Sequence, residues 1–336
     1  MRGRQDNGQD EVRQMVRCVQ LYYRAQRHQN EIARELGMSS SKVSRLLKRA
    51  FAEGVVRVEL ELPKRPKLEA ALVERFSLRD AVVIPFGEAR DIKEDLGAAA
   101  ARYFEKVAAD RVRVGVSCGY TLYCLIRGLR ERRFRDLEVY PLSAETTLEL
   151  VDLFPNTLVG MMAAKYRPHV RAYALPGQVL GSLAEIQQER QRLLRRGEVR
   201  RIYEAANNVD LALVGIGMIG EATAGFCSLA EFYGVSVQRL RALGVVGEIN
   251  YHPYDQNGQI LDRKELRALT RRVLAVTPGR LRELSAEYGK FVIAVAGGPD
   301  KRQAILGAMR GRFANVLVTD EDTAAALLAA PREAEA

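Results

Sequence analysis

The spacing of hydrophobic residues changes character along the chain. Residues 11–54 place apolar side chains three and four positions apart, which predicts three amphipathic helices. Residues 55–62 (VVRVELEL) instead alternate apolar and charged side chains, as a half-buried strand does. The sequence PKRP at 63–66 then interrupts both patterns with two prolines and two cations, which is typical of a linker. Residues 68–76 predict a short helix that leads into a second domain.

Beyond residue 80, short apolar runs alternate with longer helical segments. The predicted strands are AVVIPF (81–86), RVRVGVS (111–117), LEVYPLS (137–143), VRAYALP (170–176), LALVGIG (211–217), FVIAVAGG (291–298) and NVLVTD (315–320). The helices between them include 91–107, 121–129 and one Arg-rich run over 182–206. Because such apolar strands need cover on both faces, the pattern predicts an α/β fold with a doubly wound, mostly parallel sheet. The predicted domains are 1–62, a linker and connecting helix over 63–80, and 81–336.

Residues 29–49 (QNEIARELGMSSSKVSRLLKR) have the features of a helix-turn-helix. Ala33 supplies a small side chain where two helices cross, and Gly37 follows where the first helix must end in a left-handed turn. Ser39 or Ser40 then caps the second helix. The residues predicted to pack between the two helices are Val43, Leu46 and Leu47 against Ile32, Ala33 and Leu36.

The opposite face of the second helix combines short hydrogen-bonding side chains with cations, which suit base edges and phosphates in the major groove. The net charge of +10 supports this interpretation, because residues 1–66 carry 14 Lys and Arg against 8 Asp and Glu. A helical hairpin with a solvated polar face is the alternative. The residues predicted to contact DNA are Gln29, Ser40, Ser41, Lys42, Ser44, Arg45, Lys48 and Arg49, with Arg57 as a further candidate.

The composition disfavours several other classes of protein. No apolar run approaches the roughly 20 residues that cross a bilayer, and the polar N-terminus shows no signal-peptide segment, so we expect a cytoplasmic protein with no membrane partner. The four cysteines form no CxxC pair and the three histidines do not cluster, so we expect neither a metal site nor a disulfide framework. The segment 215–220 (GIGMIG) fits a dinucleotide fingerprint but lacks the helix and acidic strand end that should follow, so no cofactor is expected.

The ordered succession of motifs resembles the SorC family of bacterial transcription regulators, over essentially the whole chain. The N-terminal match consists of Tyr22, Tyr23 and the segment QNEIARELGMSSSKVSRLLKRAFAEGVV. The later matches are GVSCGYTL (115–122), GIG (215–217), GVVGEI (244–249), YDQNG (254–258), IAVAGGPDKRQAILGAM (293–309) and LVTDEDTAAALL (317–328). The chain departs from the family at CGYT (118–121) and at LSAETT (142–147), where Ser143 replaces an arginine of some members that bind bisphosphates.

The resemblance implies a regulator, such as a repressor, whose C-terminal domain binds a sugar or a phosphorylated sugar. It implies a fold related to ribose-phosphate isomerases and glucosamine-phosphate deaminases. It also implies a homo-oligomer, often a homotetramer, that binds a palindromic operator in double-stranded DNA. The identity of the sugar, and whether it carries a phosphate, stay open.

The candidate effector site lies where predicted strands end. The segment SCGYT (117–121) follows a strand and opens a helix, so its amides and the hydroxyls of Ser117 and Thr121 suit a phosphate or sugar oxygens, although both side chains also suit plain helix caps. Lys301 opens a later helix and is placed to pair with a phosphate, while Glu248 suits sugar hydroxyls at the other end of the ligand. Asp320 is predicted to cap the helix that follows it. The predicted effector-binding residues are Ser117, Gly119, Tyr120, Thr121, Asn156, Gly217, Glu248 and Lys301.

Two other functions remain as alternatives. A sugar-phosphate isomerase or deaminase with a DNA-binding extension needs a positioned acid and base. Glu248 is the only candidate for the acidic residue, with Lys301 as the electrophile, and the sequence shows no dedicated acid/base pair. Cys118 lies in the candidate loop, but no histidine is placed near it in the sequence to activate its thiol. A sigma-factor-like DNA binder without an effector does not account for the large α/β domain. We therefore predict a regulator without catalytic residues.

Overall fold

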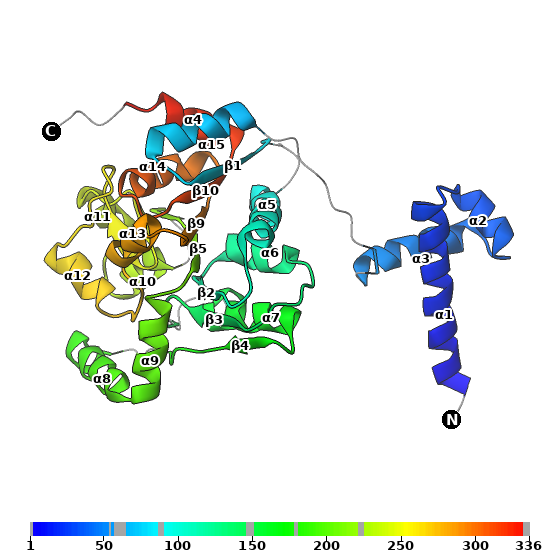
Figure 1. Ribbon diagram of the computed structural model, residues 1–336, viewed down its shortest axis with the longest axis horizontal. Coiled ribbons are helices and arrows are strands. Elements are labelled where there is room, and N and C mark those ends of the chain that lie inside the picture. Colours follow the sequence, from blue (N-terminus) through cyan, green and yellow to red (C-terminus); the bar gives the residue numbers. More distant parts are fainter. Residues whose placement is uncertain are drawn as a thin grey trace. The chain divides into compact units, whose positions relative to one another are not determined.

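The computed structural model describes residues 3–53, 55–56, 65–86, 91–145, 151–177, 181–220 and 225–331. The chain divides into two compact units, Met1–Leu62 and Pro63–Ala336. Figure 1 shows the elements of each unit, which are described separately below.

The first unit is a bundle of three helices, as the spacing of its apolar residues predicts. Helix α1 (Gly3–Val19) continues through a single π-helical turn, η1 (Gln20–Arg24), and is followed by α2 (Gln29–Glu35) and α3 (Ser40–Ala52). Of the predicted strand at 55–62, residues 57–62 lie outside the described part of the chain. The helices share one buried core, formed by Met15, Cys18, Leu21, Ile32, Ala33, Val43, Leu46, Leu47 and Ala50.

The turn between α2 and α3 has the geometry that the sequence predicts. Gly37 adopts a left-handed φ of +63°, which residues with a Cβ rarely adopt. The Ser39 hydroxyl accepts a hydrogen bond from the Lys42 amide at 3.2 Å, so Ser39 rather than Ser40 is the N-cap of α3. Ser40 instead donates its hydroxyl to Oδ1 of Asn30 at 2.7 Å and ties the start of α3 to α2. The predicted helix-turn-helix is confirmed.

All seven strands predicted beyond residue 80 are present, and they form one parallel sheet in the second unit. Its order is β1-β10-β9-β5-β2-β3-β4. The strands are β1 (Asp80–Ile84), β2 (Arg113–Val116), β3 (Leu137–Pro141), β4 (Val170–Ala172), β5 (Leu211–Gly215), β9 (Phe291–Val295) and β10 (Val316–Asp320).

Helices lie on both faces of this sheet, as expected for a doubly wound fold. Figure 1 shows α5 and α6 on one side and α9 and α13 on the other, with α4 and α15 beside β1 and β10. The helices are α4 (Pro66–Phe76), α5 (Ile92–Val107), α6 (Tyr120–Gly128), α7 (Pro155–Tyr166), α8 (Leu183–Arg195), α9 (Gly197–Ala206), α13 (Pro278–Ala286), α14 (Arg302–Arg310) and α15 (Glu321–Ala329), with short 3-10 turns η2 (Val151–Leu153) and η3 (Pro299–Lys301).

The order of the strands creates a crevice at one place. From β2 the sheet is extended by β3 and β4 in one direction, and from β5 it is extended by β9 and β10 in the other. The loops that leave the carboxyl ends of β2 and β5 therefore diverge. In open α/β sheets this reversal of direction is where ligands bind.

A second, antiparallel sheet was not predicted. It consists of β6 (Gly217–Met218), β7 (Gly247–Ile249) and β8 (His252–Tyr254), in the order β6-β7-β8. Helices α10 (Phe226–Phe232), α11 (Val237–Ala242) and α12 (Lys264–Thr270) contribute to a separate buried cluster beside it. Strands of two or three residues are too short to show an alternating pattern, so periodicity does not predict them.

The Arg-rich run over 182–206 is helical, as predicted, with one interruption. The segment forms two helices, α8 and α9, because Arg196 between them has an extended backbone conformation. Gly197 follows directly and begins the second helix. Ser182 caps α8 through its hydroxyl, which accepts from the Glu185 amide at 3.3 Å.

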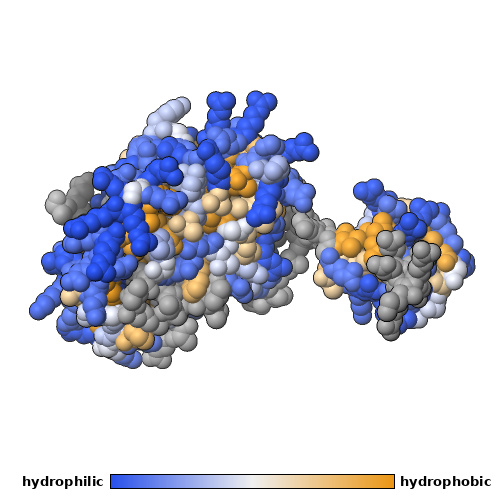
Figure 2. Space-filling view, turned by 90° about the horizontal axis from the view of Figure 1, so that it is seen from below, coloured by the Kyte–Doolittle hydropathy of each residue, from blue (hydrophilic) through white to orange (hydrophobic). Residues whose placement is uncertain are grey.

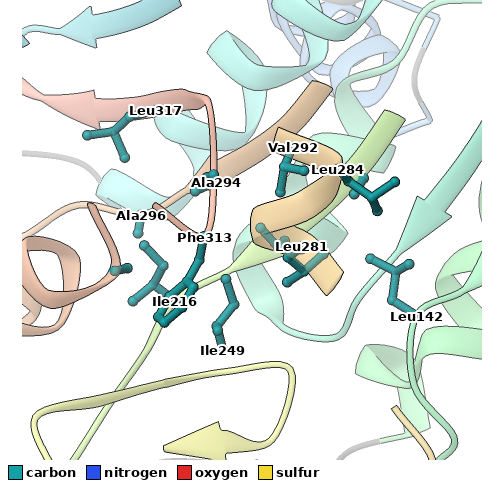
Figure 3. Packing of buried hydrophobic residues seen from close by; sticks show 14 of the residues in the cluster. Leu142, Ile216, Ile249, Leu281, Leu284, Val292, Ala294, Ala296, Phe313 and Leu317 are labelled. Atoms are coloured by element: carbon teal, nitrogen blue, oxygen red, sulfur yellow. The ribbon is translucent and has the colours of Figure 1, made fainter. Parts of the chain in front are cut away.

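The main core lies between the parallel sheet and the helices on one of its faces. Figure 3 shows side chains from α13 and β9 converging with those from the ends of β3 and β5. Leu281 and Leu284 of α13 are almost fully buried, as are Val292 and Ala294 of β9. Ile249, from the small sheet, belongs to the same cluster and links the two sheets.

The surface of the larger unit is mixed in character. Figure 2 shows hydrophilic side chains projecting around a narrower band of hydrophobic residues, and hydrophobic residues at the surface of the smaller unit. Within the described ranges, no helix combines the length and apolar character needed to cross a membrane.

Candidate functional site

The outer face of α3 carries the side chains predicted to contact DNA. Ser41, Arg45 and Lys48 are exposed, and Lys42 and Ser44 are half-buried along the same helix. Val43, Leu46 and Leu47 point into the core, so packing fixes which face of α3 is presented to solvent. Gln29 is the first residue of α2 and is half-buried. Arg57 lies outside the described residues.

Two of the predicted DNA contacts already hold the unit together. Arg49 forms an ion pair with Glu11 of α1 at 2.8 Å, and its Nε donates to Glu53. The hydroxyl hydrogen of Ser40 is used by Asn30, as described above. These exposed pairs contribute little free energy and can exchange for phosphate contacts. Arg45 and Lys48 are therefore the stronger candidates on this face.

A cavity of about 520 Å³ opens at the crevice between β2 and β5. Loops after three neighbouring strands of the parallel sheet form most of its wall, and the small sheet supplies the rest. The lining consists of residues 117–122 after β2, 215–218 after β5 and 297–301 after β9, together with Ile92, Lys93, Leu153, Gly225, Glu248 and Asn250. This cavity brings together seven of the eight predicted effector residues.

Asn156 is the predicted effector residue that does not join the others. It lies in the first turn of α7, and both ends of its side-chain amide are used by one residue. Its Nδ2 donates to the carbonyl of Leu175 at 2.8 Å, and its Oδ1 accepts from the amide of Leu175 at 3.1 Å. The Asn156 side chain thus pairs with the backbone of the segment after β4, as a neighbouring strand would, and this role is structural.

Glu248 is held in the cavity wall by the hairpin of the small sheet. Gly217 is its partner in the pairing of β6 with β7, and a Cβ at Gly217 would lie only 2.1 Å from Oε1 of Glu248. Oε2 of the same carboxylate accepts a hydrogen bond from the Tyr251 amide at 2.8 Å. Glycine at position 217 therefore leaves room for the carboxylate to lie across the backbone of β6.

Lys301 lies beside Glu248 and not at the opposite end of the cavity, which corrects the prediction from sequence. Its Nζ donates to the carbonyl of Ile216 at 2.7 Å, next to the Gly217 that pairs with Glu248. Burial lowers the pKa of Lys301 from its ordinary value; nearby Glu248 opposes this shift, and Lys93 adds to it.

The structure adds three polar residues that sequence reasoning missed. Lys93 lines the cavity from the start of α5, and its ammonium lies 5.7 Å from the centre of the Tyr120 ring. Asp300 lines the cavity in the turn before α14. Asn250 lies at 3% exposure in the turn between β7 and β8. The position of Lys93 at a helix start after a strand was a usable signal, whereas Asn250 belongs to strands too short to predict.

Asp320 caps α15, as predicted, but it also shapes the cavity. Its Oδ1 accepts from the Thr323 amide at 2.8 Å. Its Oδ2 accepts from the Thr323 hydroxyl at 2.7 Å and from the amide of Gly298 at 2.8 Å. Because Gly298 is part of the cavity wall, one buried carboxylate fixes both the helix and the loop after β9.

The features that suggested other chemistry have structural explanations. The segment 215–220 leaves β5 and enters β6, which pairs with β7, so no helix opens at the glycines as a dinucleotide site requires. The thiol of Cys118 lies 3.9 Å from the hydroxyl of Tyr251, within the cavity wall. All four cysteines are free thiols.

Family models match both units of the chain. Residues 62–329 match the family described as "Putative sugar-binding domain". Residues 14–53, which contain the helix-turn-helix, match the model of sigma-70 region 4.

Curated relatives are similar over nearly the whole chain. The sorbitol operon regulator of Klebsiella pneumoniae is 29% identical over 329 residues, covering 95% of this chain and 98% of the relative. The deoxyribonucleoside regulator of Bacillus subtilis is 28% identical over 320 residues, covering 93% of this chain and 96% of the relative. The crystal structure of the full-length sorbitol operon regulator from Klebsiella pneumoniae superposes with a TM-score of 0.66, covering 95% of this chain and 99% of that one. These relatives are regulators and not enzymes.

Proposed function

The chain belongs to the SorC-type family of sugar-binding transcription regulators, and from this premise we propose that a phosphorylated sugar, bound in the cavity of the second unit, controls its binding to operator DNA. The protein is a DNA-binding regulator that responds to a sugar. The observation that carries the choice of a phosphorylated sugar is the pair of lysines, Lys93 and Lys301, in one cavity with the carboxylate of Glu248.

The charges of the cavity suggest how the ligand is oriented. Lys93 and Lys301 both line this cavity, so an anion bound between them is stabilised by both charges. Amides of the loop at Gly119, Tyr120 and Thr121 add partial positive charge at the start of α6. Glu248 repels a phosphate and accepts hydrogen bonds from hydroxyls. We therefore place the phosphate between the lysines and the sugar hydroxyls toward Glu248.

Removal of Lys301, which is half-buried, tests this orientation. Lys301→Ala should weaken the binding of sugar phosphates such as fructose 6-phosphate by about tenfold to a hundredfold, the effect of one lost charged hydrogen bond. Isothermal calorimetry on the full chain measures it. Lys264→Ala removes an exposed lysine at the start of α12, outside the cavity lining, and should leave the affinity unchanged. Full-strength binding by the Lys301 variant would place the anion elsewhere.

The effector acts on DNA binding only through a difference in its affinity for two states of the protein. We propose that these states are two arrangements of a homo-oligomer on a palindromic operator, with residues 1–62 reading DNA, 63–80 connecting, and 81–336 binding the effector. A repressor of this kind works in the cytoplasm, where the operator is. The isomerase or deaminase alternative is disfavoured because the relatives are regulators.

An apolar stripe on the first unit offers a surface for a second copy of the chain. Val12, Val16 and Tyr23 are 44%, 37% and 41% exposed and follow one side of α1 and η1, and Phe51 of α3 extends the stripe at 46%. Tyr23 and Phe51 have ring centres 6.2 Å apart. A stripe of this kind along one helix is self-complementary, since two copies related by a twofold axis each bury the same residues.

A charge in this stripe should therefore separate two copies. Val16→Glu is expected to lower the mass of the oligomer in sedimentation and to weaken operator binding, because both helix-turn-helix units must engage together. Gln14→Glu adds the same charge to another side of α1 and serves as the control. An unchanged oligomer with unchanged operator affinity would contradict a role of the stripe in pairing.

A further inference from the structure

We propose that Ser117 is a specificity-determining residue of the cavity and that it recognises a hydroxyl group of the ligand, not an oxygen of its phosphate. Ser117 follows the last residue of β2 and is 3% exposed in the cavity wall. From sequence alone its hydroxyl suited either group. Because the assignment rests on the proposed function, the experiment below separates the failure of one from the failure of the other.

The orientation of the neighbouring Asn250 side-chain amide determines which of the two groups Ser117 can bind. Asn250 is buried, and its Nδ2 lies 2.9 Å from the carbonyl oxygen of Leu142 and 2.6 Å from that of Val276. Both partners are acceptors, so the two hydrogens of the Asn250 amide must point at them. The reversed amide would place Oδ1 against two carbonyl oxygens at these distances. The hydrogen-bond network therefore fixes Oδ1 as the atom that faces Ser117.

The direction of the next hydrogen bond follows from this. The Ser117 hydroxyl donates to Oδ1 of Asn250 over 3.1 Å. A serine hydroxyl has one hydrogen, and Oδ1 can only accept, so that hydrogen is used inside the protein. Toward the cavity Ser117 offers lone pairs alone. An ionised phosphate oxygen is also only an acceptor and is repelled, whereas a sugar hydroxyl donates and is bound.

The same turn holds the second acceptor of the cavity. Asn250 and Tyr251 both have left-handed backbones, with φ of +51° and +65°, a region that residues with a Cβ rarely adopt. The Tyr251 amide donates to Glu248, while Asn250 accepts from Ser117. This turn thus holds in place two hydroxyl-accepting groups of the cavity, the Ser117 hydroxyl and the Glu248 carboxylate.

The test compares probes that carry hydroxyls with one that does not. Ribose 5-phosphate, glucose 6-phosphate, fructose 6-phosphate and inorganic phosphate are titrated into the full chain and its Ser117→Ala variant by calorimetry, below the unfolding temperature of both. The variant should bind sugar phosphates about tenfold more weakly, the effect of one hydrogen bond, and should bind inorganic phosphate with unchanged affinity. Thr319→Val deletes another buried hydroxyl, in β10 and outside the cavity lining, with little change of shape, and should change neither affinity.

Each other outcome counts against the assignment. A loss of inorganic phosphate binding in the Ser117 variant would show that Ser117 serves the anion. An equal loss in the Thr319 variant would show a general effect of destabilisation. If no probe binds the unaltered protein, the proposed function fails and the assignment falls with it.

A second measurement needs no stable variant. Deoxy analogues of the sugar phosphate that binds remove one ligand hydroxyl at a time from the unaltered protein. One analogue should lose about tenfold in affinity, and this same loss should be absent with Ser117→Ala, because the partner of that hydroxyl is already gone. Equal losses in both proteins for every analogue would overturn the assignment.

Discussion

Replacing Arg45 and Lys48 together by alanine is expected to lower the affinity for operator DNA about a hundredfold, since two cations contribute roughly 1–3 kcal/mol each when they meet a base edge or a phosphate. Both side chains are exposed on the outer face of α3, whose inner face is fixed by packing. Lys48→Ala alone should reduce the slope of log affinity against log salt by about one, because one counterion fewer is released on binding.

The measurement is a gel-shift or fluorescence titration at several salt concentrations. The DNA is a duplex selected from random sequence with the unaltered protein, which avoids any assumption about the operator. Arg13→Ala removes a cation of α1 whose side chain is 80% exposed and which is not among the predicted DNA contacts, and it should leave the affinity within about twofold. Equal affinity of the double variant and the unaltered protein, with the helices intact by circular dichroism, would remove this face of α3 from the DNA interface.

Arg49 should behave differently from Arg45 and Lys48, although the sequence groups the three together. Its guanidinium joins α1 to α3 through Glu11 and Glu53. Ser40 likewise uses its hydroxyl on Asn30. Alanine at either position removes a contact within the unit, so a loss of DNA affinity there would not by itself establish a contact with DNA.

The largest expected loss of stability comes from Asp320. Asp320→Ala should lower the free energy of unfolding of the second unit by about 3 kcal/mol, because a buried carboxylate that accepts three hydrogen bonds is removed and the cap of α15 is lost with it. The amide of Gly298 keeps only the Thr323 hydroxyl, at 3.1 Å. The loop after β9 should loosen, so the affinity for sugar phosphates should fall as well.

Urea unfolding of the full chain measures this effect. Asp322→Ala, in the first turn of the same helix but exposed, should change the free energy of unfolding by no more than about 0.5 kcal/mol. Asp320→Asn keeps the shape of the side chain and one acceptor oxygen. Its free energy of unfolding should therefore lie between those of the Asp320→Ala and Asp322→Ala variants. A stability of the alanine variant equal to that of the unaltered protein would mean that solvent replaces the carboxylate without cost, contrary to its complete burial.

The periodicity of apolar residues predicted most of the fold. Three helices of the first unit and seven strands of the parallel sheet were predicted, since each buries one face or both faces and so leaves a repeat in the sequence. Local chemistry predicted Gly37 in a left-handed turn and the cap at Asp320. These features depend on residues within about four positions of one another, so they can be predicted from the sequence without knowledge of the fold.

The approximate location of the candidate cavity was predicted from the rule that ligands bind at the carboxyl ends of parallel strands. Strands that end in Gly, Ser or Asp place their loops at one edge of a parallel sheet, and this brought Ser117, Gly217 and Lys301 together. The small sheet, with Asn250 in its turn, could not be predicted from periodicity because its strands span two or three residues each.

Tertiary structure alone decided what each polar group does. Asn156 is occupied by Leu175, and Lys301 binds the carbonyl of Ile216 from 85 positions away in the chain. Ser117 donates to Asn250, 133 positions away, and this direction limits what it can recognise. A sequence shows which side chains can donate or accept a hydrogen bond. Which hydrogen is already used depends on partners brought close by the fold, because hydrogen bonds form only over about 3 Å and in a defined direction.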